Sequence, residues 1–228
     1  MIVKNAIVLL QFKNVEKIKR NKPILQKRLF VKCLTNIQSN EHALLNSEIF
    51  EDEKFEENTK KEVWKLLHET DVYTMKGEYY DNFENKYSER IIQGCTICLL
   101  KNDTEIDESW FEISLTDNSL VLSNGVEEIF ISHQKRFTKT EITSSTSLLG
   151  ENNTIILIDA LLKLKSEFYF TPMVLDFVND IFTINDIIEI LECFTNKRIN
   201  KTTIKRRLSN YITPTDESEI FYKKSKLF

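Results

Sequence analysis

The sequence predicts an α+β protein with two parts, a strand-rich body and a shorter, basic, largely helical part at the C-terminal end. Short apolar and β-branched segments separated by turn residues fill much of residues 1–152, whereas two capped helices follow one another after residue 183. The 228 residues and a hydrophobic fraction of 41% are sufficient to build a core in each part. We therefore predict one domain over residues 1–152 and a second over residues 153–228.

The first predicted elements are two strands and a helix. Residues 5–12 and 23–31 are rich in apolar and β-branched side chains, which favours short strands. After a polar stretch, apolar side chains at helical spacing predict a surface helix over residues 56–68. Its apolar stripe consists of Val63, Trp64, Leu66 and Leu67. Residues 79–83 are predicted to form a loop or the end of a strand.

Residues 91–100 are predicted to form a buried strand, and this strand contains the C-x-x-C motif of Cys95 and Cys98. Residues three apart on a strand point to opposite faces, so the two thiols cannot bind one metal or each other without a turn. We therefore interpret both cysteines as small core residues.

Three further strands are predicted where apolar segments alternate with Asp-Asn and Asn-Gly turns, at residues 110–115, 119–123 and 128–132. Residues 138–150 are polar and rich in Ser and Thr, and we expect a mobile connection there. Apolar residues then return at helical spacing and predict a long helix over residues 155–168 that joins the body to the C-terminal part. These apolar residues are Ile155, Ile158, Leu161, Leu162 and Leu164.

The C-terminal part has the pattern of a winged helix-turn-helix. Thr183 and Asp186 precede an apolar run with the spacing of a capping box, so a helix is predicted to begin near Ile184. Asn200 is the next good helix cap, about eight residues after the first helix. The second helix places Ile204, Leu208 and Tyr211 on one face, and Lys201, Thr202, Lys205 and Arg206 on the other. Residues 219–228 are predicted to form the wing strand, and this arrangement of elements is typical of DNA binding.

The charge distribution agrees with this interpretation. The whole chain has a formal net charge of -4. Residues 195–228 contain nine Lys or Arg and three acidic residues, a net charge of +6, which leaves -10 for the rest. A basic end on an acidic body is typical of a polyanion-binding module attached to a domain with another role.

The predicted recognition helix begins after Asn200, and its first turn is best placed to reach base edges in the major groove. Thr side chains can hydrogen-bond a base or contact a thymine methyl group, while Lys and Arg bind guanine or phosphate. Most protein–DNA contacts are to the backbone, so we weight the phosphate role above base contacts. The predicted DNA-binding residues are Asn200, Lys201, Thr202, Thr203, Lys205, Arg206 and Arg207 on the helix, with Lys223, Lys224 and Lys226 on the wing.

Several strings in residues 154–228 carry a family resemblance: DALLKLK at 159–165, FYFTP at 168–172, FTI at 182–184, IKRRL at 204–208 and SKLF at 225–228. This part of the chain resembles the C-terminal half of the Nudix-related transcriptional regulators of the NrtR type. The resemblance implies a Nudix-like α/β/α sandwich followed by the winged helix. It also implies a homodimer that binds double-stranded DNA at a near-palindromic operator and senses a small-molecule effector, a nucleotide such as ADP-ribose or a sugar.

A Nudix hydrolase requires the pattern G-x5-E-x7-R-E-U-x-E-E-x-G-U, with U aliphatic, because the helical glutamates hold Mg²⁺ against a pyrophosphate. Alignment from Ser47 keeps Glu53 and Glu62 but places Lys65 and Leu66 at the two metal-binding glutamates. Alignment three residues later keeps only Glu69. We therefore expect no enzymatic activity, no catalytic residue, no metal and no cofactor.

Other classes of function are disfavoured by composition. Four glycines are too few for a glycine-rich phosphate loop, and His42, His68 and His133 have no Ser or Cys partner in a recognisable motif. No apolar run approaches the roughly 18–20 residues of a membrane helix, and the N-terminal residues resemble a strand rather than a signal peptide. We expect a cytoplasmic protein that does not bind membranes.

Two other functions stay open from the sequence. One is an active hydrolase of ADP-ribose or nucleotide sugars whose basic end aids substrate capture, for which Mg²⁺-dependent phosphate release would decide. The other is a winged helix that binds protein instead of DNA, as many such folds do. Salt-dependent retention on DNA separates this from a regulator.

Overall fold

The computed structural model describes residues 2–19, 22–36, 41–84, 89–102, 104–136, 139–146, 149–195, 198–215 and 218–225. The body strands are β1 (Ile2–Lys19), β2 (Lys22–Lys32), β3 (Leu34–Asn36), β4 (Glu41–Ala43), β5 (Leu45–Glu48), β6 (Val72–Glu84), β7 (Glu89–Leu100), β8 (Trp110–Leu115), β9 (Ser119–Ser123), β10 (Glu128–Arg136) and β11 (Lys139–Ser145). The C-terminal strands are β12 (Ile181–Thr183), β13 (Ile212–Thr215) and β14 (Ser218–Lys224). The helices are α1 (Phe55–Leu67), α2 (Glu151–Phe170), the 3-10 helix η1 (Pro172–Phe177), α3 (Ile184–Glu192) and α4 (Lys201–Leu208).

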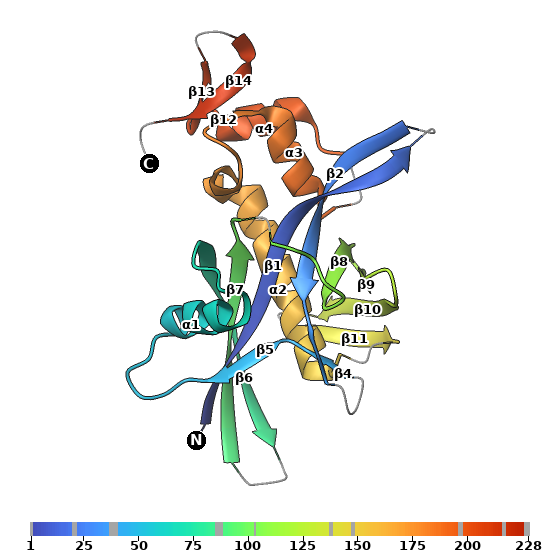
Figure 1. Cartoon of the computed structure of the whole chain (residues 1–228), viewed down its shortest axis with the longest axis vertical. Helices are drawn as coiled ribbons and strands as arrows, with labels where there is room; N and C mark the ends of the chain where they lie inside the picture. The colour runs from blue at the N-terminus through green and yellow to red at the C-terminus, as the bar shows by residue number, and fades with distance from the viewer. Residues whose placement is uncertain are drawn as a thin grey trace.

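A large mixed sheet forms the centre of the molecule (Figure 1). Its strand order is β11-β10-β9-β8-β2-β1-β7-β6, and β5 pairs with β1 outside this path. The β1–β7 pair is parallel, with Ala6 opposite Cys95, and the other pairs of this sheet are antiparallel. In Figure 1 the far ends of β1 and β2 project beyond the remaining strands.

The two faces of the sheet are covered by different helices, as the alternation of side chains along β1 shows. Ala6, Val8 and Leu10 belong to the core that includes α2, whereas Ile7 and Leu9 belong to a second core with Val63 of α1. The start of α1 lies close to β7 at Gly94, where a Cβ atom would come within 2.3 Å of the Phe55 ring. The body is therefore an α/β/α sandwich.

The predicted separation of the two cysteines is confirmed. Cys95 lies in the core on the α2 side and Cys98 in the core on the α1 side. Burial raises the pKa of each thiol to about 12. Both residues therefore act as uncharged core side chains and cannot ligate one metal.

Two predictions for the body are wrong in detail, those for the length of β1 and for residues 138–150, and one alternative for residues 79–83 is confirmed. β1 is 18 residues long instead of short, because it spans the whole body and continues into the projecting pair with β2. Residues 79–83 form the end of β6, which is one of the two predicted alternatives, and β6 resumes pairing with β7 after a register shift between Lys76 and Tyr79. Residues 139–145 form β11 instead of a mobile connection, since β10 pairs with this segment and buried Thr140 donates a hydrogen bond to Asp159 (2.6 Å).

The predicted joining helix is confirmed as α2, and it begins at Glu151. Its apolar residues pack on the sheet, and its last turns reach the C-terminal part, where Phe168 lies 5.5 Å from Phe194 between ring centroids. One hydrophobic cluster therefore continues from the sheet through α2 to α3 and α4, and the predicted boundary after residue 152 stays a prediction. No helix in the described ranges is long and apolar enough to cross a membrane.

The predicted helix caps in the C-terminal part are confirmed. Thr183 accepts a hydrogen bond from the Asp186 backbone N–H, and the Asp186 carboxylate accepts one from the Thr183 N–H, so a complete capping box begins α3. The Asn200 side chain accepts a hydrogen bond from the Thr202 N–H (2.8 Å) at the start of α4. Strands β12, β14 and β13 form a small antiparallel sheet beside these helices.

Candidate nucleic-acid interface and the α1 surface

The two faces of α4 differ as predicted. Ile204 and Leu208 are buried in the core shared with α3. The opposite side presents side chains to solvent, and these are Lys201, Thr202, Thr203, Lys205 and Arg206. The helix is fixed by its Asn200 cap and its buried face, so these polar and cationic groups are presented from a rigid element.

The small sheet contacts α4 and adds cations next to it. The contact joins Lys205 of α4 to Tyr222 of β14, with 5.1 Å between the ammonium group and the ring centroid. Lys223 is exposed, whereas Lys224 is half-buried and lies 3.9 Å from the Asp180 carboxylate. Lys226, also predicted to contact DNA, is outside the residues that the structure describes.

Arg207 differs from the prediction that it contacts the DNA backbone. Its guanidinium donates hydrogen bonds to the carbonyl oxygens of Tyr169 and Phe168 at the end of α2. It also lies over the Tyr169 ring, 4.9 Å from the centroid. Desolvation by this partial burial lowers the pKa of Arg207 from its usual value. The side chain faces inward because position 207 of α4 lies toward α2, and it therefore holds the two helices together.

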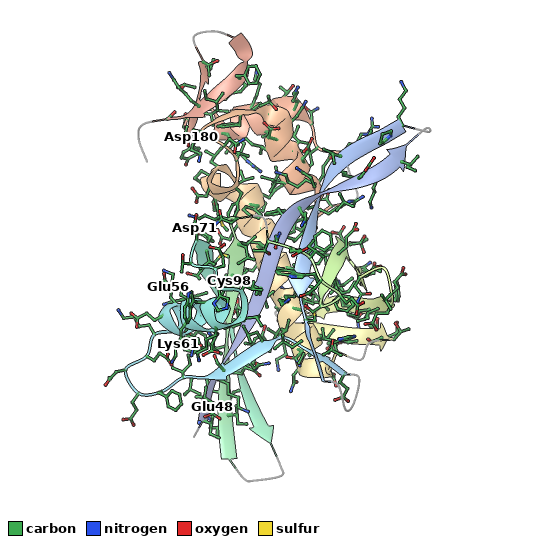
Figure 2. All side chains as sticks on the ribbon, in the orientation of Figure 1. Glu48, Glu56, Lys61, Asp71, Cys98 and Asp180 are labelled. Atoms are coloured by element: carbon green, nitrogen blue, oxygen red, sulfur yellow. The ribbon has the colours of Figure 1, made fainter. Side chains whose placement is uncertain are left out.

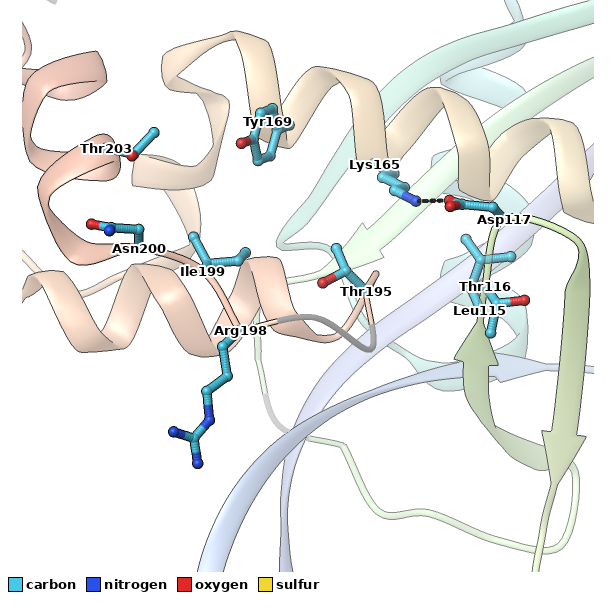
Figure 3. Close-up of a pocket in the computed structure, with 10 residues that line it drawn as sticks. All are labelled: Leu115, Thr116, Asp117, Lys165, Tyr169, Thr195, Arg198, Ile199, Asn200 and Thr203. Carbon is cyan, nitrogen blue, oxygen red and sulfur yellow. Dashed lines mark hydrogen bonds and ion pairs between the residues drawn. The ribbon is translucent and has the colours of Figure 1, made fainter.

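A pocket of about 410 Å³ lies beside the N-terminal end of α4. We call it the α2–α4 pocket, and its lining residues are Leu115, Thr116, Asp117, Lys165, Tyr169, Thr195, Arg198, Ile199, Asn200 and Thr203. Figure 3 shows Lys165 and Asp117 facing each other at one end and Asn200 and Thr203 at the other. Sequence reasoning missed this pocket because its walls come from three segments far apart in the chain.

The structure decides between the two alignments of the hydrolase pattern. Helix α1 ends at Leu67, and His68 follows with φ 55°, a left-handed conformation typical of glycine. Alignment from Ser47 places the last glycine of the pattern on His68, in agreement with this geometry. The later alignment is wrong, because it requires Glu69 on a helix that has already ended.

In the alignment from Ser47, the positions that bind metal in a hydrolase are occupied by unsuitable groups. The Lys65 ammonium pairs with the Glu62 carboxylate at 2.7 Å, and Leu66 packs against the core on the α1 side. Glu53 pairs with Lys61 at 3.1 Å, and the Lys61 hydrogen bond lowers the pKa of Glu53. Lys61 is labelled on α1 in Figure 2. In the described part of the chain, no three His, Cys, Asp or Glu side chains are grouped to hold a metal ion.

A buried polar network, not predicted from the sequence, joins α1 to the sheet. The Asn5 amide donates hydrogen bonds to Asn58 Oδ1 (3.1 Å) and Thr59 Oγ1 (2.9 Å) on α1. Thr96 donates to Asn5 Oδ1 (2.9 Å), and Ser47 donates to Asn58 Oδ1 (2.6 Å). A polar residue directly before the apolar run Ala6–Leu10 was the available signal. The network fixes α1 to the sheet.

Comparison with solved structures identifies the fold. A MutT/nudix family protein from Enterococcus faecalis superposes with a TM-score of 0.74 at 14% sequence identity, over 99% of this chain and 88% of that chain. NrtR from Shewanella oneidensis gives a TM-score of 0.61 at 12% identity over 99% and 94% of the two chains. The same protein complexed with a 27mer DNA gives 0.60 at 10% identity over 98% and 93%.

At the level of sequence, no protein-family model and no curated protein matches the chain. Identities of 10–14% with solved structures establish a common fold and do not transfer an activity. The chain therefore has an α+β Nudix-like fold that extends over nearly all of its 228 residues.

Proposed function

We propose that this protein is a DNA-binding transcriptional regulator, a repressor, whose Nudix-like body binds a small molecule and does not hydrolyse it. In this proposal β12, α3, α4, β13 and β14 are a winged helix-turn-helix, with α4 as the recognition helix. The observation that carries the proposal is the exposed face of α4. A capped helix with an apolar inner face presents three cations and two threonines outward, namely Lys201, Lys205, Arg206, Thr202 and Thr203.

Several features support DNA as the partner. Residues 195–228, which include α4 and β14, have a net charge of +6, while the remainder of the chain has a net charge of -10. Lys and Arg on a rigid helix bind phosphates and the edges of guanine, and the first turn of such a helix reaches the bases. NrtR from Shewanella oneidensis, which has a similar fold, was crystallised with a 27mer DNA.

A single module of this size covers one half-site, so we propose a homodimer on a near-palindromic operator. The effector in this proposal is a nucleotide such as ADP-ribose, or a sugar. Its binding to the body would alter DNA affinity through a coupling free energy between two sites.

The absence of hydrolase activity is proposed from the chemistry of α1. Mg²⁺ requires oxygen ligands in nearly octahedral arrangement. The two positions that supply them in a hydrolase carry Lys65 and Leu66. The two glutamates that are kept are paired with lysines, Glu62 with Lys65 and Glu53 with Lys61. A cation at position 65 repels a metal ion.

One observation favours an active hydrolase as the second candidate. The MutT/nudix family protein from Enterococcus faecalis superposes with a higher TM-score, 0.74, than either NrtR structure, at 0.61 and 0.60. Glu53 and Glu62 also stand at glutamate positions of the pattern. Incubation with ADP-ribose and nucleotide sugars, with and without Mg²⁺, tests this candidate, and metal-dependent release of AMP or phosphate would establish it.

The proposal is tested by selecting bound fragments from random double-stranded DNA and measuring their affinity at several salt concentrations. About six cationic contacts predict that log K falls with log salt with a slope of about -5. A Lys201→Gln, Arg206→Gln variant should bind at least tenfold more weakly. Lys60→Gln, on the exposed surface of α1, serves as the matched control and should bind like the wild type. Failure of the wild type to bind DNA at low salt would refute the proposal.

A further inference from the structure

The α2–α4 pocket is built from three separate segments of the chain. Leu115 to Asp117 come from the end of β8 and its turn, and Lys165 and Tyr169 come from α2. The third segment contributes residues between α3 and α4 and one residue of α4, namely Thr195, Arg198, Ile199, Asn200 and Thr203. The volume of about 410 Å³ lies within the range of roughly 300–1,000 Å³ that is usual for small-molecule sites. A molecule bound here would contact the body and α4 at the same time.

Two residues of the pocket also hold α4 in position. Asn200 lines the pocket and caps the first turn of α4 through the Thr202 N–H (2.8 Å). Tyr169 lines the pocket and lies under Arg207, in the last turn of α4, at 4.9 Å. Both ends of the helix are thus held by pocket residues, so a change in the pocket reaches α4 through direct contacts.

The lining residues define the chemistry of a ligand. Leu115, Ile199 and the Tyr169 ring give apolar walls that suit a flat body. Lys165 supplies a cation whose side chain is 26% exposed, and it pairs at 3.2 Å with Asp117, which is 75% exposed. An ion pair with one exposed partner contributes little to stability, so an anionic ligand can replace Asp117 as the partner of Lys165. The Arg198 side chain points away from the pocket in Figure 3.

From these contacts we propose that the α2–α4 pocket is a ligand-binding site for a small aromatic carboxylate, and that occupation of this site changes the DNA affinity of α4. The second part rests on the proposed function, while the first does not. The carboxylate pairs with Lys165, and the ring lies against Tyr169 and Ile199. The ligand shifts the equilibrium between two positions of α4, and the size of this shift is set by the difference in its affinity for the two positions.

The first experiment measures binding without DNA. Benzoate and salicylate are the probes, and benzyl alcohol is the uncharged comparison, with thermal unfolding and ligand-observed NMR as readouts. A carboxylate at about ten times its Kd should raise the unfolding temperature by roughly 3–6 °C. Benzyl alcohol should bind at least tenfold more weakly.

Matched lysine variants of α2 locate the site. Lys165→Met keeps the apolar stem and removes the charge, and it should lose at least tenfold in affinity for the carboxylates. Lys163 lies two residues earlier on α2, pairs with Glu78 at 3.8 Å and does not line the pocket. The Lys163→Met variant should therefore bind the carboxylates like the wild type. Failure of both carboxylates to bind, or equal binding by wild type and Lys165→Met, would overturn the proposal.

The second experiment measures the effect of benzoate, salicylate and ADP-ribose on DNA affinity. The proposal expects at least a threefold change with a carboxylate in the wild type and in Lys163→Met, and none in Lys165→Met. Carboxylate binding without any effect on DNA affinity would overturn the coupling. A protein that binds carboxylates through Lys165 and does not bind DNA would retain the pocket as a ligand site and refute the regulator. An ADP-ribose effect that persists in Lys165→Met, with no carboxylate effect, would locate the effector site elsewhere.

Discussion

Arg207 of α4 lies over the ring of Tyr169 of α2, with 4.9 Å between the guanidinium carbon and the ring centroid. It also donates hydrogen bonds to the carbonyl oxygens of Tyr169 and Phe168, the latter at 3.4 Å. The last four carbonyl groups of a helix have no partner within it, and a cation near them is favoured by the helix dipole. Arg207 therefore closes the C-terminal end of α2 and fixes α4 to it.

From this contact we predict that Arg207→Ala lowers the free energy of unfolding by about 1–3 kcal/mol, because charge-assisted hydrogen bonds and the ring contact are lost. Urea denaturation measures the change. Arg206→Ala is the control at the adjacent position, where the side chain is exposed, and it should stay within about 0.5 kcal/mol of the wild type. Equal stability of the two variants would contradict the structural role of Arg207.

For DNA affinity we expect the opposite order, with a larger effect of Arg206 than of Arg207. Arg206→Gln removes an exposed cation of α4, so we predict weaker binding and a salt slope smaller in magnitude by about 1. Fluorescence anisotropy at several salt concentrations gives both quantities. Replacement of Arg206 without any change of slope would remove this side chain from the interface.

The sequence predicted those features whose causes are local. A capping box depends on residues three apart, so Thr183 and Asp186 were sufficient to locate the start of α3. The same holds for Asn200 and α4. The strand alternation likewise predicted that Cys95 and Cys98 lie on opposite faces.

Features that depend on distant segments were not predictable in this way. Arg206 and Arg207 are neighbours with equal charge, and only the position of α2 makes one a surface residue and the other an interhelical contact. The Ser- and Thr-rich segment of β11 resembled a loop because its partner Asp159 lies on α2. Asn5 and Asn58 are 53 residues apart, so their hydrogen bond has no sequence signature.

The polar network under α1 gives a third prediction. Asn58 is buried and connects Asn5, Ser47 and Glu53. Asn58→Ala removes the hydrogen bonds of Asn58 to Asn5, Ser47 and Glu53, although the Asn5 amide keeps Thr59 as a partner. Each lost hydrogen bond costs about 0.5–1.5 kcal/mol. We expect a loss of about 2–4 kcal/mol in urea denaturation. Asn14→Ala, at an exposed position of β1, should be nearly neutral.

The response to Mg²⁺ is the fourth prediction. Since the Lys65 ammonium pairs with Glu62, addition of about 10 mM Mg²⁺ to the wild type should not raise its unfolding temperature, and EDTA should not lower it. Lys65→Glu replaces the ion pair by two carboxylates three residues apart on α1, which costs roughly 0.5 kcal/mol. Mg²⁺ should restore stability in this variant alone. Stabilisation of the wild type by Mg²⁺ would contradict the proposed loss of the metal site.

The pH dependence of stability provides the last prediction, through buried His133 on β10. Desolvation lowers the pKa of His133 below its ordinary value of 6.5, although the charge of Asp159 opposes this effect. A lowered pKa means that the unfolded chain binds the proton more tightly than the folded protein. The contribution of His133 to stability is therefore complete above about pH 6.5 and falls as the pH drops toward the folded-state pKa.

His133→Gln removes this titration. Urea denaturation between pH 7.5 and pH 5 should show that the wild type loses stability more steeply than the variant, by at most about 1.4 kcal/mol per pH unit for a single proton. Carboxylates elsewhere titrate in both proteins, so the difference between the two curves isolates His133. Parallel curves over this range would contradict the prediction, because they would show that protonation of His133 costs nothing in the folded state.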